Sequence, residues 1–143
     1  MKVGLKLLTP QAKVPTYATN GSGAFDIYST TEGVILPNSN NVFGTGCVFQ
    51  IPKGYVMLIF SRSGHGFGHD IRLGNCVGVI DSDYRGEVKV KLTSDSNFKA
   101  MKVNKGDRIA QGIILPYEVV EFEELPDVDE TERGEGGFGS TGN

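Results

Sequence analysis

The chain of 143 residues has room for one domain, and a hydrophobic fraction of 38% with 20 glycines is typical of a globular protein, which excludes disorder throughout. The net charge of −3 gives no support for a nucleic-acid partner, because such a partner requires a basic face. The sequence shows neither an apolar run of about 18 residues nor a good signal peptide, so we expect no membrane partner and a cytoplasmic, intracellular location.

Alternation of apolar and polar residues dominates the chain and predicts β-strands. The first is expected near the N-terminus, where Val3, Leu5 and Leu7 alternate with lysines and a glycine. The others are expected, in chain order, at Val42–Ile51, Tyr55–Phe60, Gly86–Thr93, Arg108–Leu115 and Tyr117–Leu125. Turn sequences rich in Pro, Asn, Asp and Gly separate them, so the pattern indicates an all-β sandwich or jelly-roll-like β-barrel.

The C-terminal segment differs from the rest, because an acidic stretch is followed by a glycine-rich one. Such a segment cannot bury enough apolar surface to order itself. We therefore expect a β-barrel domain of residues 1–126 and a mobile C-terminal arm of residues 127–143. Gly134–Gly139 matches the dinucleotide-binding pattern G-x-G-x-x-G, but too few residues follow for the required helix. Ser140 stands where a P-loop requires lysine, although the glycine N–H groups could still bind phosphate oxygens.

Neither the cysteines nor the histidines predict a metal site. Cys47 and Cys76 lack the spacing of a zinc motif, so we expect two small buried thiols. His65 and His69, with Asp70 next, could share a metal ion on a helix. Because glycines separate them, a helix is unfavourable there, and we expect solvated histidines in a loop.

Two clusters carry chemistry suited to phosphate. Ser61–Gly64 places an arginine, whose planar donors match phosphate, beside hydroxyls and a glycine; the alternative is a plain turn. Arg108 and Gln111 could also reach phosphate oxygens, or could form a buried structural pair.

Two further clusters suit a nucleoside. Gly74–Glu87 predicts a hairpin whose exposed backbone could pair with a planar base, with Asp81 placed to accept a proton from water; an ordinary hairpin with a polar turn is the alternative. Phe138 is an aromatic residue among glycines with no core to join, and stacking on a base would explain it. The four clusters together predict a site for a nucleoside polyphosphate.

Five motifs, in this order, resemble those of the homotrimeric dUTP pyrophosphatases (dUTPases) and span nearly the whole chain. They are Ser22–Ile27, Ser61–Gly64, Gly74–Glu87, Arg108–Gln111 and Arg133–Gly142. The resemblance implies a jelly-roll-like barrel, three active sites per trimer that each draw on all three subunits, and a flexible arm that closes over a neighbour's site. Ala24 and Ser61 depart from the family pattern, which usually has glycine and proline at these positions.

The same resemblance implies that the chain hydrolyses dUTP to dUMP and pyrophosphate with Mg²⁺, lowering dUTP and supplying dUMP for thymidylate synthesis. It makes Asp81 the general base, and it makes Asp26 at most an indirect ligand of magnesium through water. The base and deoxyribose would be read by Asn75, Val79, Ile80, Tyr84, Lys89 and the stacking ring of Phe138. The phosphates would be held by Arg62, Ser63, Gly64 and Gln111, and by Arg133, Gly139, Ser140 and Thr141 of the arm.

Two other functions remain open on this sequence. A dCTP deaminase, or a bifunctional enzyme on the same fold, would need an acid/base group at the base, for which Glu87 is the nearest candidate. A nucleotide-gated regulator would instead use closure of the arm to signal to a protein partner.

Overall fold

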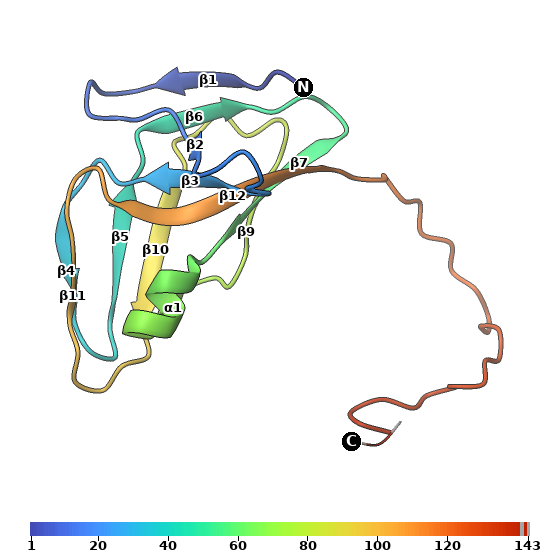
Figure 1. Cartoon of the computed structure of the whole chain (residues 1–143). Coiled ribbons are helices and arrows are strands. Elements are labelled where there is room, and N and C mark those ends of the chain that lie inside the picture. The colour runs from blue at the N-terminus through green and yellow to red at the C-terminus, as the bar shows by residue number, and fades with distance from the viewer. Residues whose placement is uncertain (141, 143) are drawn as a thin grey trace.

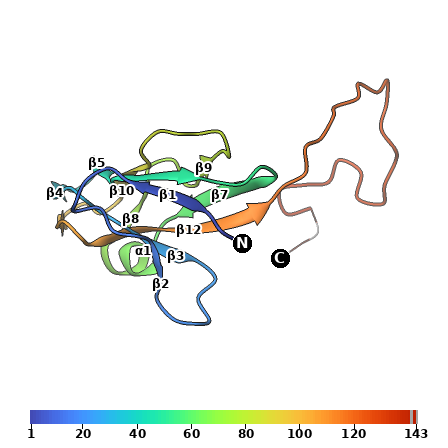
Figure 2. The same ribbon diagram turned by 90° about the horizontal axis from the view of Figure 1, so that it is seen from above.

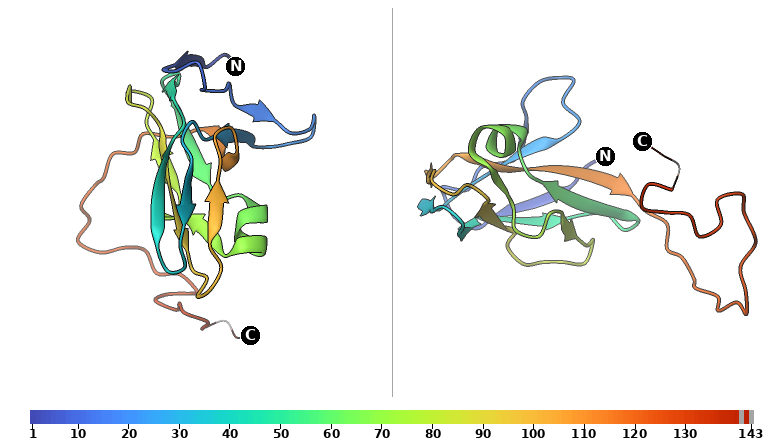
Figure 3. Two further views of the ribbon diagram at one scale, coloured as in Figure 1. Left: turned by 90° about the vertical axis from the view of Figure 1, so that its left-hand side faces the viewer. Right: turned by 90° about the horizontal axis from the view of Figure 1, so that it is seen from below.

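Short strands make up most of the fold in the computed structural model, which describes residues 1–140 and residue 142 (Figure 1). They are β1 (Gly4–Leu7), β2 (Thr16–Tyr17), β3 (Phe25–Tyr28), β4 (Gly33–Ile35), β5 (Asn40–Gly44), β6 (Cys47–Gln50), β7 (Tyr55–Phe60), β8 (Ile71–Leu73), β9 (Gly78–Ile80), β10 (Lys89–Ser94), β11 (Met101–Val103) and β12 (Arg108–Pro116). One short helix, α1 (Ser63–His69), is found within the described residues and lies outside the strands next to β8 (Figure 3). The described part of the chain has no helix that is long and apolar enough to cross a membrane. The predicted all-β class and jelly-roll-like barrel are confirmed.

The strands form antiparallel sheets that enclose one hydrophobic core (Figure 2). The largest sheet has the order β2-β3-β12-β7-β9, and a second has the order β5-β10-β8. Strand β10 shows the pattern behind the fold, because Val90 and Leu92 are buried while Lys89 and Lys91 between them are exposed. The largest fully buried side chains are Phe43, Ile27, Ile35, Met57, Ile71, Leu73, Leu92 and Ile109.

The strands predicted before Pro116 are found, with one break and one late start. Strand β7 has the predicted bounds, and β12 is one residue longer than predicted. The single strand predicted at Val42–Ile51 is wrong, because β5 and β6 are separated at Thr45 and Gly46. Gly46 has a left-handed φ of 65°, and the buried Thr45 hydroxyl donates a 2.6 Å hydrogen bond to the Val88 carbonyl. Strand β10 begins at Lys89, three residues later than predicted, directly after Val88, whose carbonyl accepts the bond from Thr45 and whose N–H donates to the Cys47 carbonyl.

The strand predicted at Tyr117–Leu125 is wrong. Strand β12 ends at Pro116, which pairs with Tyr55, the first residue of β7, so the chain then runs past the end of its partner strand. Its apolar side chains are exposed, including Val119 and Phe122, and the segment leaves the barrel (Figures 1 and 2). The division of the chain at residue 126 stays a prediction, because such a segment could become ordered against another subunit.

The cysteines do not form a pair among the described residues. Cys47 is buried, as predicted, and burial raises the pKa of its thiol. The prediction was wrong for Cys76, which is exposed because it occupies a tight turn with a φ of 61° beside the hairpin.

Candidate active site

The ends of three neighbouring strands bring the first group of predicted residues together. Strand β12 lies between β3 and β7, and its register sets Gln111 opposite Asp26 on one side and Phe60 on the other. Strand β7 ends at Phe60, so Arg62 follows two residues later, next to both. This topology explains why motifs separated by more than eighty residues meet at one place.

Asp26 anchors two arginines at this place. Its carboxylate is buried, and it accepts hydrogen bonds from Arg62 Nε at 3.3 Å and from Arg108 Nη1 at 3.2 Å. Arg62 Nη1 also donates to the backbone carbonyl of Arg108 at 3.2 Å. Two guanidinium groups around one carboxylate leave one positive charge uncompensated, and their planes are fixed before any ligand arrives. The arrangement therefore provides a preformed, cationic anchor of the kind that binds phosphate.

The cationic anchor borders two adjoining pockets. One, of about 340 Å³, is lined by Asp26, Arg62, Ser63, Arg108 and Gln111 with the Ser22–Ala24 loop. The other, of about 430 Å³, is lined by Ser61, Arg62, Ser63, Gly66, Phe67 and Gln111. We call this region the phosphate pocket, and it gathers Arg62, Ser63 and Gln111 as predicted. Gly64 is not among the residues that line it.

The two departures from the family pattern are accommodated here. The Ser61 hydroxyl accepts a 2.9 Å hydrogen bond from the Leu73 N–H, and Gln111 Nε2 donates to the Ser61 carbonyl at 3.1 Å. Ser61 thus ties the start of the arginine loop to β8 and β12, so it fixes the loop by hydrogen bonding rather than by backbone rigidity. Ala24 is half-buried and adds a methyl group to the pocket wall.

The structure contradicts the loop predicted around the histidines, because α1 is a helix. Its first turn is closed by His65 and Gly66 N–H groups on the Arg62 carbonyl, and it ends at Asp70 in a left-handed conformation. Instead of being solvated, His65 is 8% exposed and its Nε2 lies 3.5 Å from Arg62 Nη1. Burial of His65 and packing against β8 therefore outweigh the helix-breaking tendency of the glycines.

Burial, together with the positive charge of Arg62 and the neighbouring His69, lowers the pKa of His65 to about 4, against an opposing effect of Asp107. The unfolded chain, in which histidine has its ordinary pKa of about 6.5, therefore takes up a proton that folded His65 does not. We expect the free energy of unfolding to fall by about 2 kcal/mol between pH 7 and pH 5 through this residue alone. Urea unfolding at both values measures the loss, which should shrink in His65→Gln; an equal loss in that variant would contradict the assignment.

A second pocket lies at the predicted hairpin. Strand β9 is the edge of the five-stranded sheet, so one side of its backbone remains available to pair with a planar base. A pocket of about 320 Å³ beside it is lined by Ile80, Tyr84, Glu87, Val88 and Lys89. We call it the nucleoside pocket. Three of the predicted base-reading residues line it, whereas Val79 and Asn75 are exposed nearby without lining it.

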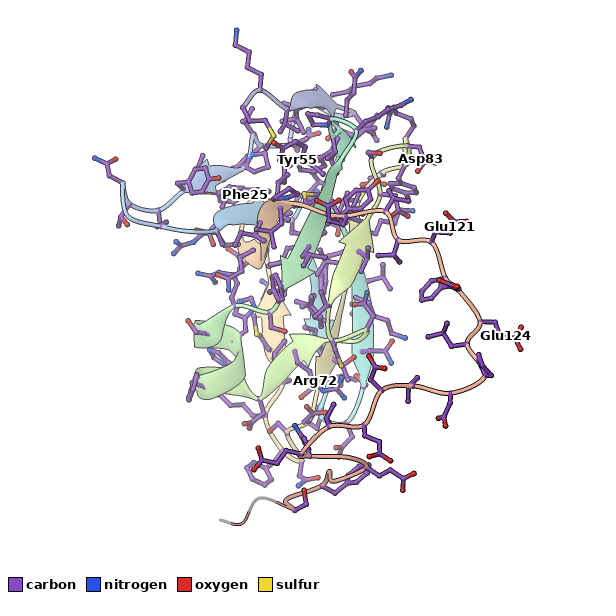
Figure 4. The ribbon with its side chains drawn as sticks, turned by 90° about the vertical axis from the view of Figure 1, so that its right-hand side faces the viewer. Phe25, Tyr55, Arg72, Asp83, Glu121 and Glu124 are labelled. Carbon is purple, nitrogen blue, oxygen red and sulfur yellow. The ribbon has the colours of Figure 1, made fainter. Side chains whose placement is uncertain are left out.

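The turn after β9 holds Asp81 and Tyr84 in place. Tyr84 N–H donates to the Asp81 carbonyl at 3.2 Å, and the Tyr84 hydroxyl donates to the Glu87 carbonyl at 3.1 Å. The Tyr84 ring crosses Gly86 at the position that a Cβ would occupy, so this fold of the turn requires glycine there. The Asp81 side chain is exposed at the mouth of the turn, where a carboxylate can reach a water molecule. Figure 4 shows Asp83, from the same turn, at the edge of the barrel facing the start of the arm.

The described part of the arm consists of successive tight turns. Gly134, Gly136 and Ser140 N–H groups each donate to the carbonyl three residues earlier, at 3.0 Å. Arg133 Nε donates to the Gly136 carbonyl at 2.7 Å, and the Phe138 ring is fully exposed. The segment that joins β12 to the arm curves away from the barrel, with Glu121 and Glu124 along its course (Figure 4). Thr141 lies outside the described residues, so its predicted role is untouched by the structure.

The chain therefore presents three separate parts of a site rather than one complete site. No residue of the described chain lines both the phosphate pocket and the nucleoside pocket, and the arm residues line neither. Chemically, the parts provide a cationic phosphate anchor, an apolar nucleoside pocket beside a carboxylate, and an aromatic residue on a long tether.

Sequence reasoning missed two features of these parts. Asp26 was considered only as an indirect metal contact, yet its carboxylate orients both arginines. Phe67 attracted no attention, although it is exposed at the rim of the phosphate pocket. The role of Asp26 could have been suspected from the sequence, because an acidic residue stands in one motif and arginines stand in two others. Phe67 could have been noticed as an aromatic residue within a glycine-rich run.

Comparisons with known proteins agree on one family. A family model described as dUTPase matches residues 10–142. A deoxyuridine 5'-triphosphate nucleotidohydrolase of Nautilia profundicola is 44% identical over 142 residues, which cover 99% of both chains. The enzyme of the same name from Helicobacter pylori strain J99 is 42% identical, and the match covers 99% of this chain and 97% of that protein. Among solved structures, the Staphylococcus bacteriophage 80alpha dUTPase with dUPNHPP superimposes with a TM-score of 0.90 at 28% identity and 99% coverage of both chains. The fold is also that of a mutant dUTPase from phage phi11 of S. aureus, described with a structural Mg(II) ion, with a TM-score of 0.82 at 22% identity, covering 89% of this chain and 98% of that one.

Proposed function

The chain belongs to the dUTPase family and hydrolyses dUTP to dUMP and pyrophosphate, and from that premise we propose which of its residues act and how three subunits share them. The observation that carries the proposal is the separation of the phosphate pocket from the nucleoside pocket on one chain. Each pocket has the chemistry for one half of dUTP, and neither is a complete site.

In the proposed reaction, Asp81 is the general base. It directs a water molecule at the α-phosphorus and accepts a proton from it as the new P–O bond forms and pyrophosphate leaves. Its exposed position directly after β9 supports this role, because the backbone edge of β9 would hold uracil beside it. Arg62, Ser63 and Gln111 would bind the phosphates, and the anchoring carboxylate of Asp26 keeps Arg62 oriented as charge develops.

Tyr84 is proposed to select the deoxyribose by packing where a 2′-hydroxyl would lie. Gly86→Ala should displace the Tyr84 ring, because the new methyl group would occupy its place. We expect the preference for dUTP over UTP, measured as the ratio of kcat/KM values, to fall about tenfold. Tyr84→Phe is the matched control, since it keeps the ring, and should retain the preference. A Gly86→Ala enzyme with the original preference would argue against selection by this ring.

Magnesium would take its ligands mainly from the triphosphate and water. The described residues contain no group of three or more His, Cys, Asp or Glu side chains able to hold a metal ion, and Asp26 is already engaged by two arginines. This donor set fits a cation that arrives with the nucleotide, with Asp26 as an indirect contact through water at most. Such a cation would neutralise phosphate charge.

The proposed assembly is a homotrimer with shared active sites. The nucleoside pocket of one subunit would face the phosphate pocket of another, and the arm of a third would cover both. The apolar side chains exposed between Tyr117 and Leu125 support an intersubunit path for the arm, because burial against a neighbour would remove them from water.

The deaminase alternative has less support from the structure. The Glu87 carboxylate accepts a 2.9 Å hydrogen bond from the Gly46 N–H and lies 3.8 Å from Lys89 Nζ, so it has a structural role at the edge of the nucleoside pocket. Release of ammonia from dCTP would reveal a deaminase. The regulator hypothesis stays a prediction.

The function is tested by measuring pyrophosphate release with magnesium from dUTP, dTTP, dCTP and UTP separately. We expect rapid release from dUTP and at least a hundredfold lower kcat/KM with each of the others, because the pocket recognises uracil by hydrogen bonds and excludes the 2′-hydroxyl. Comparable rates with all four nucleotides would contradict the proposed use of the nucleoside pocket.

A further inference from the structure

Phe67 stands in solvent beside the phosphate pocket without a role in the proposed reaction. Its side chain is 95% exposed, and it lines the pocket together with Ser63 and Gln111. Phe67 follows Ser63 by four residues on α1, so the two side chains leave the same face of the helix. Single exposed apolar residues are common on proteins. What distinguishes Phe67 is that it lines a pocket together with Arg62, Ser63 and Gln111, the residues proposed to bind the phosphates.

The glycine-rich arm has a surface that suits an aromatic ring. Gly136 ends one tight turn and Gly137 begins the next. A Cβ added at Gly136 would meet Ser140 Oγ and the Arg133 carbonyl, whereas one added at Gly137 would meet no atom within 4 Å, so Gly137 presents the open backbone face. A backbone without side chains can lie flat on a ring at van der Waals distance. The chain between Pro116 and Gly134 can span up to roughly 60 Å, so a neighbouring phosphate pocket is within its reach.

We propose that Phe67 is a positioning residue for the arm: its ring is the surface on which the Gly136–Gly137 turn of another subunit's arm rests when that arm covers the triphosphate. The inference deepens the proposed function and depends on it. Arm residues that contact phosphates held by Arg62 and Ser63 would lie close to Phe67, because Phe67 lines the same pocket as these two residues. The ring shields one side of the pocket from water and favours the closed position of the arm.

The rate of trypsin cleavage measures how accessible the arm is, because Arg133 is the only lysine or arginine after Pro116. With magnesium and dUpNHpp bound, we expect cleavage after Arg133 in the full-length enzyme to slow strongly. In Phe67→Ala this protection should fall about three- to tenfold, as expected for loss of one aromatic contact. Phe67→Tyr should retain it. Phe98→Ala is the matched control, because Phe98 is 89% exposed but does not line the phosphate pocket, and it should behave as the original enzyme.

Whether Phe67 acts through the arm is tested by combining Phe67→Ala with truncation of the chain after Glu132. Phe67→Ala should raise KM for dUTP in the full-length enzyme and have no effect on the residual activity of enzyme truncated after Glu132. The inference is overturned if dUpNHpp protects Arg133 from trypsin equally in Phe67→Ala and in the original enzyme. It is also overturned if Phe67→Ala impairs the truncated enzyme as much as the full-length enzyme. Neither result would contradict closure of the arm itself. Absence of protection by dUpNHpp in the original enzyme overturns arm closure itself, and this inference with it.

Discussion

Asp81→Asn is expected to lower kcat for dUTP by about 10³-fold or more while changing the affinity for dUpNHpp only a few-fold. The amide has nearly the same shape as the carboxylate, so the turn that follows β9 and the nucleoside pocket should persist. It cannot accept a proton from the attacking water, so only the chemical step should suffer. Pyrophosphate release measures kcat, and calorimetric titration with dUpNHpp measures binding.

Asp83→Asn provides the control for this experiment. Asp83 is exposed in the same turn, two residues after Asp81, and the substitution changes the net charge by the same amount (Figure 4). We expect its kcat to stay within a few-fold of the original. Near-normal turnover in Asp81→Asn would refute the assigned base, and an equal loss in both variants would point to the charge of the turn rather than to one carboxylate.

Truncation after Glu132 is expected to lower kcat/KM for dUTP by about 10²-fold or more and to leave the barrel folded. The removed residues include Arg133 and Phe138, whose side chains make no contribution to the core, since the core consists of barrel strands. Their loss should open the site to water and remove the stacking partner of uracil. Steady-state kinetics, thermal unfolding and sedimentation together separate loss of catalysis from loss of assembly. A truncated enzyme of normal activity would deny the arm a catalytic role.

Trimers assembled from two different variants test whether each active site combines residues from different subunits. In a trimer containing both Asp81→Asn subunits and truncated subunits, an intact Asp81 from one subunit can meet an intact arm from another. We therefore expect activity to return on mixing, although each parent is nearly inactive. If Asp81 and the arm served the same subunit's site, every site would lack one of them, and mixing would restore nothing.

The sequence was sufficient to predict the bounds of a strand where the local residue pattern ended at the same place as the pairing with the neighbouring strand. Strand β7 could be predicted with its observed bounds because a continuous run of apolar residues lies between a turn and a polar loop. Strand β12 is equally clear, although its bulge between Arg108 and Ala110 could not be predicted, since it depends on the register with β3. The break between β5 and β6 was hidden for the same reason, because the hydrogen bond from Thr45 joins residues 43 positions apart.

The two largest errors come from packing that local propensity does not contain. Helix α1 forms despite its glycines because His65 is buried beside Arg62. Residues 117–125 carry a strand-like pattern but follow Pro116, where the partner strand β7 has ended. For the candidate site, the motifs contained Arg62, Ser63 and Gln111 of one pocket and Ile80, Tyr84 and Lys89 of the other. The anchoring of two arginines by Asp26 could not be predicted, because it depends on the topology of β3, β7 and β12.

The two arginines proposed to bind the phosphates differ in how the chain holds them, and we expect this difference to have a kinetic consequence. Arg62 is fixed to Asp26 in the barrel, whereas Arg133 is bonded to Gly136 of its own arm. We expect the rigid barrel cation to govern the association rate of the nucleotide, because it needs no rearrangement on encounter. We expect the tethered Arg133 to engage afterwards and to govern the residence time, so loss of the arm should show first as faster dissociation of the nucleotide.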